Sequence, residues 1–216
     1  MADRCVIFDL DGTLCDSLGD IVYAVNHLRE RHGFSLLSRE QVQACVGRGM
    51  KNLLIQVLRD TDLTEEAVTA EFKECFADSL GKASALYPGV PEGLKELHNA
   101  GYRIALLSNK PQPFCEILLK DYHIATYFDA VAGSAPDRPL KPDPECILAL
   151  LREMEFKGER SDVFMAGDSV YDMQTASNAG VCGLFAKWGY GPVPDPAPRD
   201  SFPDFPAMIQ FIRSRT

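Results

Sequence analysis

The strongest pattern along the chain is a set of short apolar runs, each followed by polar residues. Three clear runs lie at residues 5–8, 104–107 and 163–166, and two weaker ones lie at residues 128–132 and 181–186. Continuous apolar runs of this length are typical of strands that are buried on both faces, as in a parallel sheet. The pattern therefore predicts a parallel sheet of about five strands.

Helical segments lie between the later runs. Gly101 and Gly180 each follow such a segment, as glycine commonly does after a helix, and Pro111 and Pro144 each open one. The expected helices cover residues 90–100, 111–122, 144–155 and 170–179. Because strand and helix alternate, we predict an α/β fold with a doubly wound, Rossmann-like parallel sheet. The proline-rich stretch 191–206 is expected to be an irregular surface segment before a last short helix.

The alternation of strand and helix fails in the first half of the chain, where helical signals follow one another. Apolar residues at helical spacing begin at Leu18, and Gly33 ends that segment. A capping box at residues 38–41 opens a second helix, residues 53–58 form another apolar face, and Thr64 begins a further helix. Four successive helices without a strand predict a small α-helical domain at residues 16–83, inserted after the first strand.

Composition and charge narrow the function classes. The chain has 216 residues, with 22 Lys and Arg against 31 Asp and Glu, and its formal net charge of -9 argues against non-specific nucleic-acid binding. No stretch approaches the roughly 20 apolar residues that span a bilayer, and the first apolar run is too short for a signal peptide. Seven scattered cysteines without a CxxC pair indicate neither a zinc site nor a disulfide framework. We expect a cytoplasmic protein with no nucleic-acid or membrane partner.

Polar residues at the ends of the apolar runs are the candidate chemical groups. In open α/β sheets, ligands bind beyond the carboxyl ends of the strands, where such residues converge. They are Asp9, Asp11, Ser108, Asn109, Lys141, Asp168 and Asp172. Several carboxylates close together repel one another unless a cation lies among them, and hard oxygen ligands without His or Cys favour Mg²⁺. A Mg²⁺ site beside a lysine and a serine indicates an anionic substrate, most simply a phosphate.

Four of these segments resemble the motifs of a known family. Residues 9–13, Asp-Leu-Asp-Gly-Thr, resemble the DxDGT nucleophile motif of the haloacid dehalogenase superfamily of phosphohydrolases. Ser108 is similar to its second motif, residues 141–142 to its third, and residues 167–172 match its fourth, GDxxxD. The motifs occur in the family's order over nearly the whole chain. The position of the insert is similar to the subgroup with a helical cap, and the chain most resembles phosphoglycolate phosphatases and their relatives.

The resemblance implies a role for each catalytic group. Asp9 would attack phosphorus and become an aspartyl phosphate, which divides one hard displacement into two easier ones. Asp11 would protonate the leaving oxygen and then deprotonate the attacking water. Gly12 would permit the turn that lets both acids reach one phosphate. Lys141 would balance the charge on Asp9 and on the phosphoryl oxygens.

The resemblance also implies a metal site and a set of substrate contacts. Mg²⁺ would be held by Asp9, the main-chain carbonyl of Asp11 and Asp168. Asp172 would hold metal-bound waters, and Ser169 would lie beside it in the same outer layer. The expected substrate-binding residues are Gly12, Thr13, Ser108, Asn109, Lys141 and Arg48. Residues 16–83 would be the cap domain, residues 1–15 and 84–216 the catalytic core, and the cap surface would determine substrate identity.

Several of these residues also have a purely structural interpretation. Ser108 could cap the next helix, and Asp172 could serve the dipole of the helix it opens. Lys141 could be a solvated loop lysine, and Arg48 a solvated arginine. Trp188 fits a packing role. The histidines are interpreted as non-catalytic, and they are His27, His32, His98 and His123.

The resulting hypothesis is a Mg²⁺-dependent phosphomonoester hydrolase for a small phosphorylated metabolite, with 2-phosphoglycolate the leading candidate. A phosphomutase or a pyrophosphatase of the same fold is the alternative reaction. A dehalogenase is disfavoured because Asp11 supplies a second acid. A different class would be a receiver-like signalling phosphoacceptor or a non-catalytic binding module. The chain would be a monomer or a homodimer.

Overall fold

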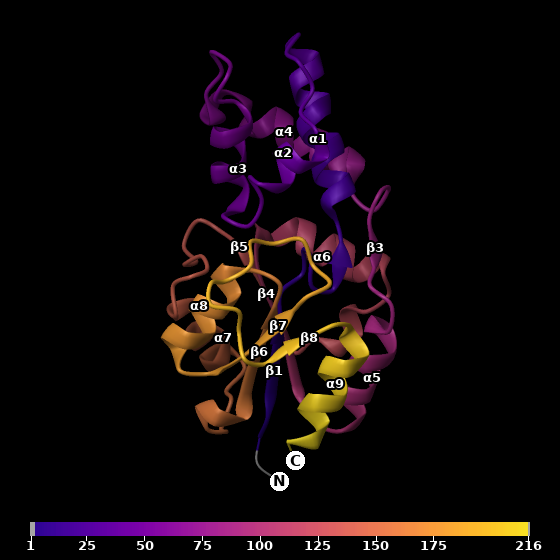
Figure 1. The fold of residues 1–216 in the computed structure, drawn as a ribbon, viewed down its shortest axis with the longest axis vertical. Coiled ribbons are helices and arrows are strands. Elements are labelled where there is room, and N and C mark those ends of the chain that lie inside the picture. Colours follow the sequence, from indigo (N-terminus) through magenta and orange to yellow (C-terminus); the bar gives the residue numbers. More distant parts are fainter. Residues whose placement is uncertain (1–2, 216) are drawn as a thin grey trace.

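A six-stranded sheet forms the centre of the molecule, with strand order β5-β4-β1-β6-β7-β8 (Figure 1). The computed structural model describes residues 3–215. The strands of this sheet are β1 (Cys5–Phe8), β4 (Arg103–Pro111), β5 (Ala130–Ser134), β6 (Val163–Gly167), β7 (Cys182–Ala186) and β8 (Ser201–Phe202). Every neighbouring pair is parallel. The predicted α/β class and parallel sheet are confirmed.

The sheet has one strand more than the number predicted. The additional strand is β8, which pairs with the end of β7 at Phe185 and Ala186. It is two residues long and lies in the stretch that the sequence pattern predicts to be irregular. A strand this short produces no apolar run, so hydrophobic periodicity does not reveal it.

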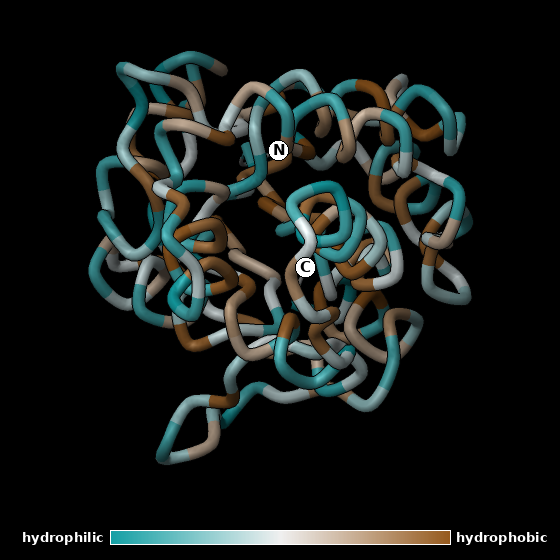
Figure 2. The backbone as a smooth tube through the Cα atoms, turned by 90° about the horizontal axis from the view of Figure 1, so that it is seen from above, coloured by the Kyte–Doolittle hydropathy of each residue, from teal (hydrophilic) through white to brown (hydrophobic). Residues whose placement is uncertain are grey.

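Helices cover both faces of the sheet, as a doubly wound fold requires. One face carries α5 (Val90–Asn99), α6 (Gln112–Asp121) and α9 (Phe205–Ser214), and the other carries α7 (Glu145–Glu153) and α8 (Val170–Ala179). Within β1, Val6 and Phe8 belong to the first apolar cluster, whereas Cys5 and Ile7 belong to the second. Both sides of the strand are therefore apolar. Viewed from above, apolar backbone runs through the interior and hydrophilic segments lie mostly at the periphery (Figure 2).

The helix ends follow local signals. Ser169 opens α8 with a capping box, and Gly180, with a φ of 71°, follows its last residue. α6 begins one residue later than predicted because Pro111 still belongs to β4. Two short 3₁₀ helices, η1 (Ala125–Tyr127) and η2 (Arg160–Asp162), precede β5 and β6. No helix within residues 3–215 is long and apolar enough to cross a membrane.

A bundle of helices stands above the sheet, and we call it the helical insert (Figure 1). It consists of α1 (Leu18–Arg31), α2 (Arg39–Gln43), α3 (Gly49–Val57) and α4 (Glu65–Ser79). Its inward faces form a separate apolar cluster, in which Val25, Leu54 and Phe72 are buried. Phe114 of α6 joins this cluster, and its ring lies 4.8 Å from the ring of Phe76, centroid to centroid. The insert thus has its own core and contacts the α/β unit through α6.

The two chain connectors that join the insert to the sheet pair with each other. β2 (Cys15–Asp16) and β3 (Ala85–Leu86) form an antiparallel pair that the sequence pattern does not predict. Asp20, buried in the first turn of α1, accepts hydrogen bonds from Gly81 N and Ala83 N, both at 2.7 Å. This carboxylate ties the end of the insert to its beginning.

A buried arginine holds the far end of the insert together. Arg29 of α1 is 1% exposed. Its Nε donates to Ser35 O at 2.6 Å, Nη1 donates to Val57 O, and the guanidinium pairs with both carboxylate oxygens of Asp60 at 2.8 and 2.7 Å. The fork of donors therefore joins α1 to the loop after it and to the end of α3.

Replacing Arg29 tests this role. We expect Arg29→Met to lower the free energy of unfolding by about 3 kcal/mol, because buried carbonyls lose their donor. Arg31→Met, two residues along the same helix, should have a much smaller effect because Arg31 and its partner Glu71 are solvent-accessible. Urea denaturation of the wild type and both variants measures the difference. Equal losses in the two variants would contradict the assignment.

Candidate active site

Asp9 and Asp11 follow β1 at the point where the chain turns sharply. The carbonyl of Leu10 accepts a hydrogen bond from the backbone N–H of Cys15 at 3.0 Å, which closes the turn. Gly12 has a φ of 82°, a conformation that favours glycine. Because of this turn, both carboxyl side chains line the same cavity.

Glycines crowd around Asp168, which follows β6. A Cβ atom at Gly12 would lie 2.0 Å from Asp168 Oδ2, and a Cβ atom at Gly189 would lie 2.3 Å from the same oxygen. The backbone N–H groups of Tyr190 and Gly191 donate to Asp168 Oδ2 at 2.9 and 2.7 Å. Two backbone segments thus approach this carboxylate closely, and the second one fixes its orientation.

Three buried carboxylates meet where β1 and β6 end. One oxygen from each of Asp9, Asp168 and Asp172 lies within 4.8 Å of the others. Burial raises the pKa of Asp9 to about 6, against the opposing charge of Lys141. Burial also raises the pKa of Asp168 well above its ordinary value, and the charges of Asp172 and Asp9 add to that effect. Such a group is electrostatically unfavourable unless positive charge lies close to it.

Lys141 supplies positive charge at this cluster. Its Nζ lies 2.6 Å from Asp172 Oδ1 and 2.8 Å from Asp9 Oδ1. The second contact is an ion pair, and Asp9 Oδ1 is buried without a hydrogen-bond partner among residues 3–215. Burial alone would lower the pKa of Lys141, but the two carboxylates raise it overall. The lysine therefore remains an ammonium ion between the two acids.

The outer carboxylate, Asp172, is held by its own helix end. Ser169 donates to Asp172 Oδ2 from its backbone N–H at 3.0 Å and from its hydroxyl at 2.5 Å. The other carboxylate oxygen pairs with Lys141. Both oxygens of Asp172 are thus engaged within the protein. Asp172 lies in the first turn of α8, as its structural interpretation expects, and it also contacts Lys141; its role toward metal-bound waters stays a prediction.

Lys110 is the site residue that the sequence reasoning missed. Its side chain is 3% exposed, and its Nζ lies 2.9 Å from Asp11 Oδ1 and 3.2 Å from Asp11 Oδ2. It also lies 4.5 Å from the ring centroid of Phe76. Burial lowers the pKa of Lys110, but the charge of Asp11 raises it overall. The available signal was its place directly after Ser108 and Asn109, at the carboxyl end of an apolar run.

Ser108 and Asn109 have different surroundings. Both are buried and line the cavity. The Asn109 amide donates to Gly47 O at 2.9 Å and to Lys141 O at 3.1 Å, and its Oδ1 accepts from Lys141 N at 2.9 Å. The side chain of Asn109 therefore holds the Lys141 loop and the helical insert. The hydroxyl of Ser108 only accepts a long hydrogen bond, 3.4 Å, from Lys110 N.

Two of the predicted substrate-binding side chains do not line this cavity. Thr13 is fully buried, and its hydroxyl donates to Asp168 Oδ1 at 3.5 Å. Arg48 donates to the hydroxyl of Tyr171 at 2.8 Å, with its guanidinium over the same ring. The structure thus gives Thr13 a supporting contact to a carboxylate and gives Arg48 a contact between the insert and α8.

The cavity lies between the strand ends and the helical insert, and its two walls differ in chemistry. The sheet side supplies the acids, both lysines and the serine. The insert side is apolar, and its side chains are Ile21, Val46, Met50, Leu53, Phe72 and Phe76. The cavity volume is about 80 Å³. The site can therefore hold a compact anion at the sheet and enclose whatever is attached to it.

Known proteins with similar sequences share this organisation over most of their length. The chain is 36% identical over 196 residues to the phosphoglycolate phosphatase of Vibrio parahaemolyticus serotype O3:K6, covering 87% of this chain and 85% of the relative. It is 34% identical over 206 residues to the phosphoglycolate phosphatase of Nitrosococcus oceani, covering 92% of this chain and 89% of that protein.

Solved structures show the same fold, and a family model identifies the chain. The crystal structure of a predicted phosphoglycolate phosphatase from Haemophilus somnus 129pt superposes with a TM-score of 0.87 at 26% identity, covering 97% of each chain. CbbY from Rhodobacter sphaeroides, solved in complex with phosphate, shares the fold with a TM-score of 0.79 at 23% identity, covering 93% of each chain. The model for haloacid dehalogenase-like hydrolases matches residues 6–185. With its carboxylates at the strand ends and its helical insert, the chain belongs to the haloacid dehalogenase-like hydrolase family.

Proposed function

We propose that this chain is a Mg²⁺-dependent phosphomonoester hydrolase that acts on a small phosphorylated metabolite. The observation that carries the proposal is the pairing of two carboxyl groups with two different ammonium groups in one cavity. Asp9 contacts Lys141, and Asp11 contacts Lys110. A nucleophile and a proton-transferring acid are thus available on one turn of the chain.

The carboxylate cluster fits a divalent cation. All three groups supply hard oxygen atoms, and Asp9 Oδ1 is buried without a hydrogen-bond donor among the described residues. Asp9, Asp168 and the main-chain carbonyl of Asp11 would hold Mg²⁺, with Asp172 next to them. When bound, the ion neutralises phosphoryl oxygens and polarises the phosphorus centre. Asp172 is fully engaged by Lys141 and Ser169, which favours an outer role for it.

The proposed reaction has two displacements at phosphorus. In the first, a carboxylate oxygen of Asp9 forms a bond to phosphorus, the ester P–O bond breaks, and the leaving oxygen takes a proton from Asp11. In the second, Asp11 removes a proton from water, the water oxygen bonds to phosphorus, and the bond to Asp9 breaks. Lys141 stays charged beside Asp9 and balances the negative charge in both steps. Ser108 is available to donate to a phosphoryl oxygen because its hydroxyl donates to no protein group in residues 3–215.

The leading substrate candidate is 2-phosphoglycolate. Curated relatives that share 36% and 34% identity with this chain are named phosphoglycolate phosphatases. A phosphomutase or a pyrophosphatase would use the same acids, and no contact in the site favours either.

The helical insert is proposed to act as a cap domain. We assign residues 16–83 to the cap and residues 1–15 and 84–216 to the catalytic core. Contacts between the two parts surround the cavity, since Asn109 donates to Gly47 O and Gln43 donates to Tyr190 O, both at 2.9 Å. Opening these contacts would admit substrate, and closing them would exclude water during the first displacement.

A reducing location, such as the cytoplasm, agrees with the cysteines. All seven are free, and most of them are buried. A thiol such as Cys15 beside the acids therefore serves as a small apolar group. A monomeric or homodimeric state stays a prediction.

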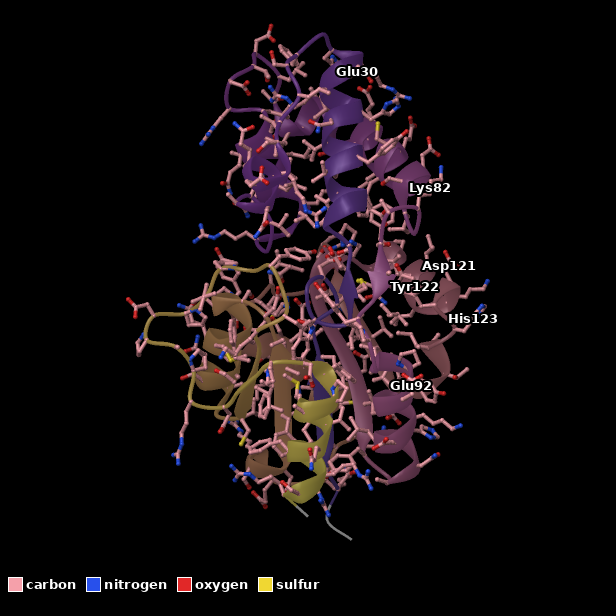
Figure 3. The ribbon with its side chains drawn as sticks, turned by 45° about the vertical axis from the view of Figure 1, so that its right-hand side comes forward. Glu30, Lys82, Glu92, Asp121, Tyr122 and His123 are labelled. Carbon is pink, nitrogen blue, oxygen red and sulfur yellow. The ribbon has the colours of Figure 1, made fainter. Side chains whose placement is uncertain are left out.

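Replacing the nucleophile tests the proposed function. We expect Asp9→Asn to lower phosphate release from 2-phosphoglycolate in Mg²⁺ by about 1,000-fold or more, because an amide cannot form the acyl phosphate. Asp121→Asn is the matched control, since Asp121 lies on the outer end of α6, away from the cavity (Figure 3). Colorimetric phosphate release measures both. Undiminished turnover in Asp9→Asn would overturn the proposal, and a single stoichiometric burst from the wild type would identify a phosphoacceptor instead.

The glycine packing around Asp168 predicts a specific loss of metal affinity. A methyl group at Gly189 would lie 2.3 Å from Asp168 Oδ2, so Gly189→Ala must displace that carboxylate. We expect the Kd for Mg²⁺ to rise about 10-fold or more. Gly101→Ala is the control, because a Cβ atom at Gly101 meets no atom within 4 Å, although its φ of 80° disfavours alanine. Calorimetric titration of Mg²⁺ decides between the two, and equal Kd values in both variants would contradict the role of Asp168.

A further inference from the structure

We propose that Lys110 is the specificity-determining residue for an anionic leaving group. Its ammonium would bind a carboxylate attached one or two bonds beyond the ester oxygen of the substrate. This inference rests on the proposed phosphomonoester hydrolysis and adds to it a recognition group on the core sheet rather than on the helical insert.

Lys110 lies beside Asp11, the group proposed to protonate the leaving oxygen. Asp11 must reach the leaving oxygen in order to transfer a proton to it. Lys110 Nζ lies 2.9 and 3.2 Å from the two oxygens of Asp11. A charged group that is one or two bonds from the leaving oxygen therefore comes within reach of the same ammonium. In 2-phosphoglycolate, a single CH₂ group separates the ester oxygen from the carboxylate carbon.

The ammonium of Lys110 has more N–H donors than it has acceptor groups in the described part of the protein. An ammonium group has three N–H donors. Within residues 3–215, the only acceptors for Lys110 Nζ are the two carboxylate oxygens of Asp11. The ring of Phe76 also contacts the ammonium, with its centroid 4.5 Å from Nζ. A substrate anion can thus accept the third N–H without displacing another hydrogen bond between the lysine and residues 3–215.

Apart from Ser108, which is left for a phosphoryl oxygen, the donor side chains described along the rest of the cavity are already engaged, so they compete little with Lys110 for a second anion. The side chains of the helical insert that line the cavity are apolar. Lys141 is occupied by Asp9 and Asp172. The Asn109 amide donates to two carbonyls, and the hydroxyl of Tyr190 pairs with Ser17 at 2.9 Å. Arg48, the predicted cationic contact, binds Tyr171 instead.

The apolar surroundings of Lys110 strengthen the interaction of its ammonium with an anion. The side chain of Lys110 is 3% exposed, and its neighbours Phe76 and Phe114 are buried aromatic residues of the apolar wall. A charge-assisted hydrogen bond is stronger in such surroundings than in water. A carboxylate would gain this bond in full, whereas a neutral hydroxyl at the same position would accept only a weaker hydrogen bond from the ammonium. The geometry therefore favours phosphorylated carboxylates over neutral phosphate esters.

Binding measurements in an inactive background test the inference without relying on turnover. The comparison uses 2-phosphoglycolate and 2-hydroxyethyl phosphate, which differ mainly in the carboxylate. In Asp9→Asn with Mg²⁺, we expect 2-phosphoglycolate to bind about 30-fold more tightly than the neutral ester. Adding Lys110→Met should remove most of that advantage, and Lys110→Arg should restore part of it. Calorimetry gives the three Kd ratios, one for each protein.

Controls separate recognition from structural damage. Lys120→Met, at an exposed lysine on α6, should leave the ratio between the two ligands unchanged. Inorganic phosphate, which lacks a leaving group, should bind equally well with and without Lys110→Met. Equal losses for both esters, or no preference for the carboxylate in the starting protein, would overturn the inference.

Turnover provides an independent readout. With the wild-type nucleophile, Lys110→Met should lower kcat/KM on both esters, because Asp11 loses its partner, but about ten times further on 2-phosphoglycolate. An equal fall on both substrates would reduce Lys110 to a residue that positions Asp11. If neither ester is hydrolysed, the proposed function fails, while the binding ratios still decide the role of Lys110.

Discussion

Repulsion among buried acids is the constraint to which the rest of the site responds. Asp9, Asp168 and Asp172 present oxygens within 4.8 Å of one another, and all three are buried. Like charges at this distance in a low-dielectric site cannot persist without compensation. Each surrounding feature supplies part of that compensation, from backbone N–H groups on Asp168 to the ammonium of Lys141 between the other two.

The two lysines divide the site into halves with different chemistry. Lys141 lies with Asp9 and Asp172, on the side where the proposed reaction would attack phosphorus. Lys110 lies with Asp11, on the side where the proposed reaction would protonate the leaving oxygen. Because each ammonium is bound to a different acid, two carboxylates only two residues apart can have different environments. Environments that differ in this way let neighbouring acids take different roles at one pH.

The spacing of apolar residues predicts the sheet and the insert, because buried strands and packed helices each produce a recognisable pattern of apolar positions. It predicts neither β8 nor the β2–β3 pair, since strands of two residues are too short to produce such a pattern. The rule that ligands bind beyond the carboxyl ends of parallel strands identifies most of the candidate site residues, from Asp9 to Asp172. It does not show which way a side chain points. For that reason Arg48 was expected at the substrate but contacts Tyr171, and Lys110 was overlooked although it contacts Asp11.

The distribution of charged side chains around the cavity also changes which part of the protein is expected to determine substrate specificity. The family resemblance read from the sequence assigns substrate identity to the surface of the insert. In the structure, the insert wall is apolar and the ionised side chains of the cavity belong to the core. An apolar wall excludes water and limits size, but it cannot distinguish a carboxylate from a hydroxyl by attraction. Discrimination by charge must then come from β4, where Lys110 follows Ser108 and Asn109. The same strand end would hold the phosphate and recognise what is attached to it.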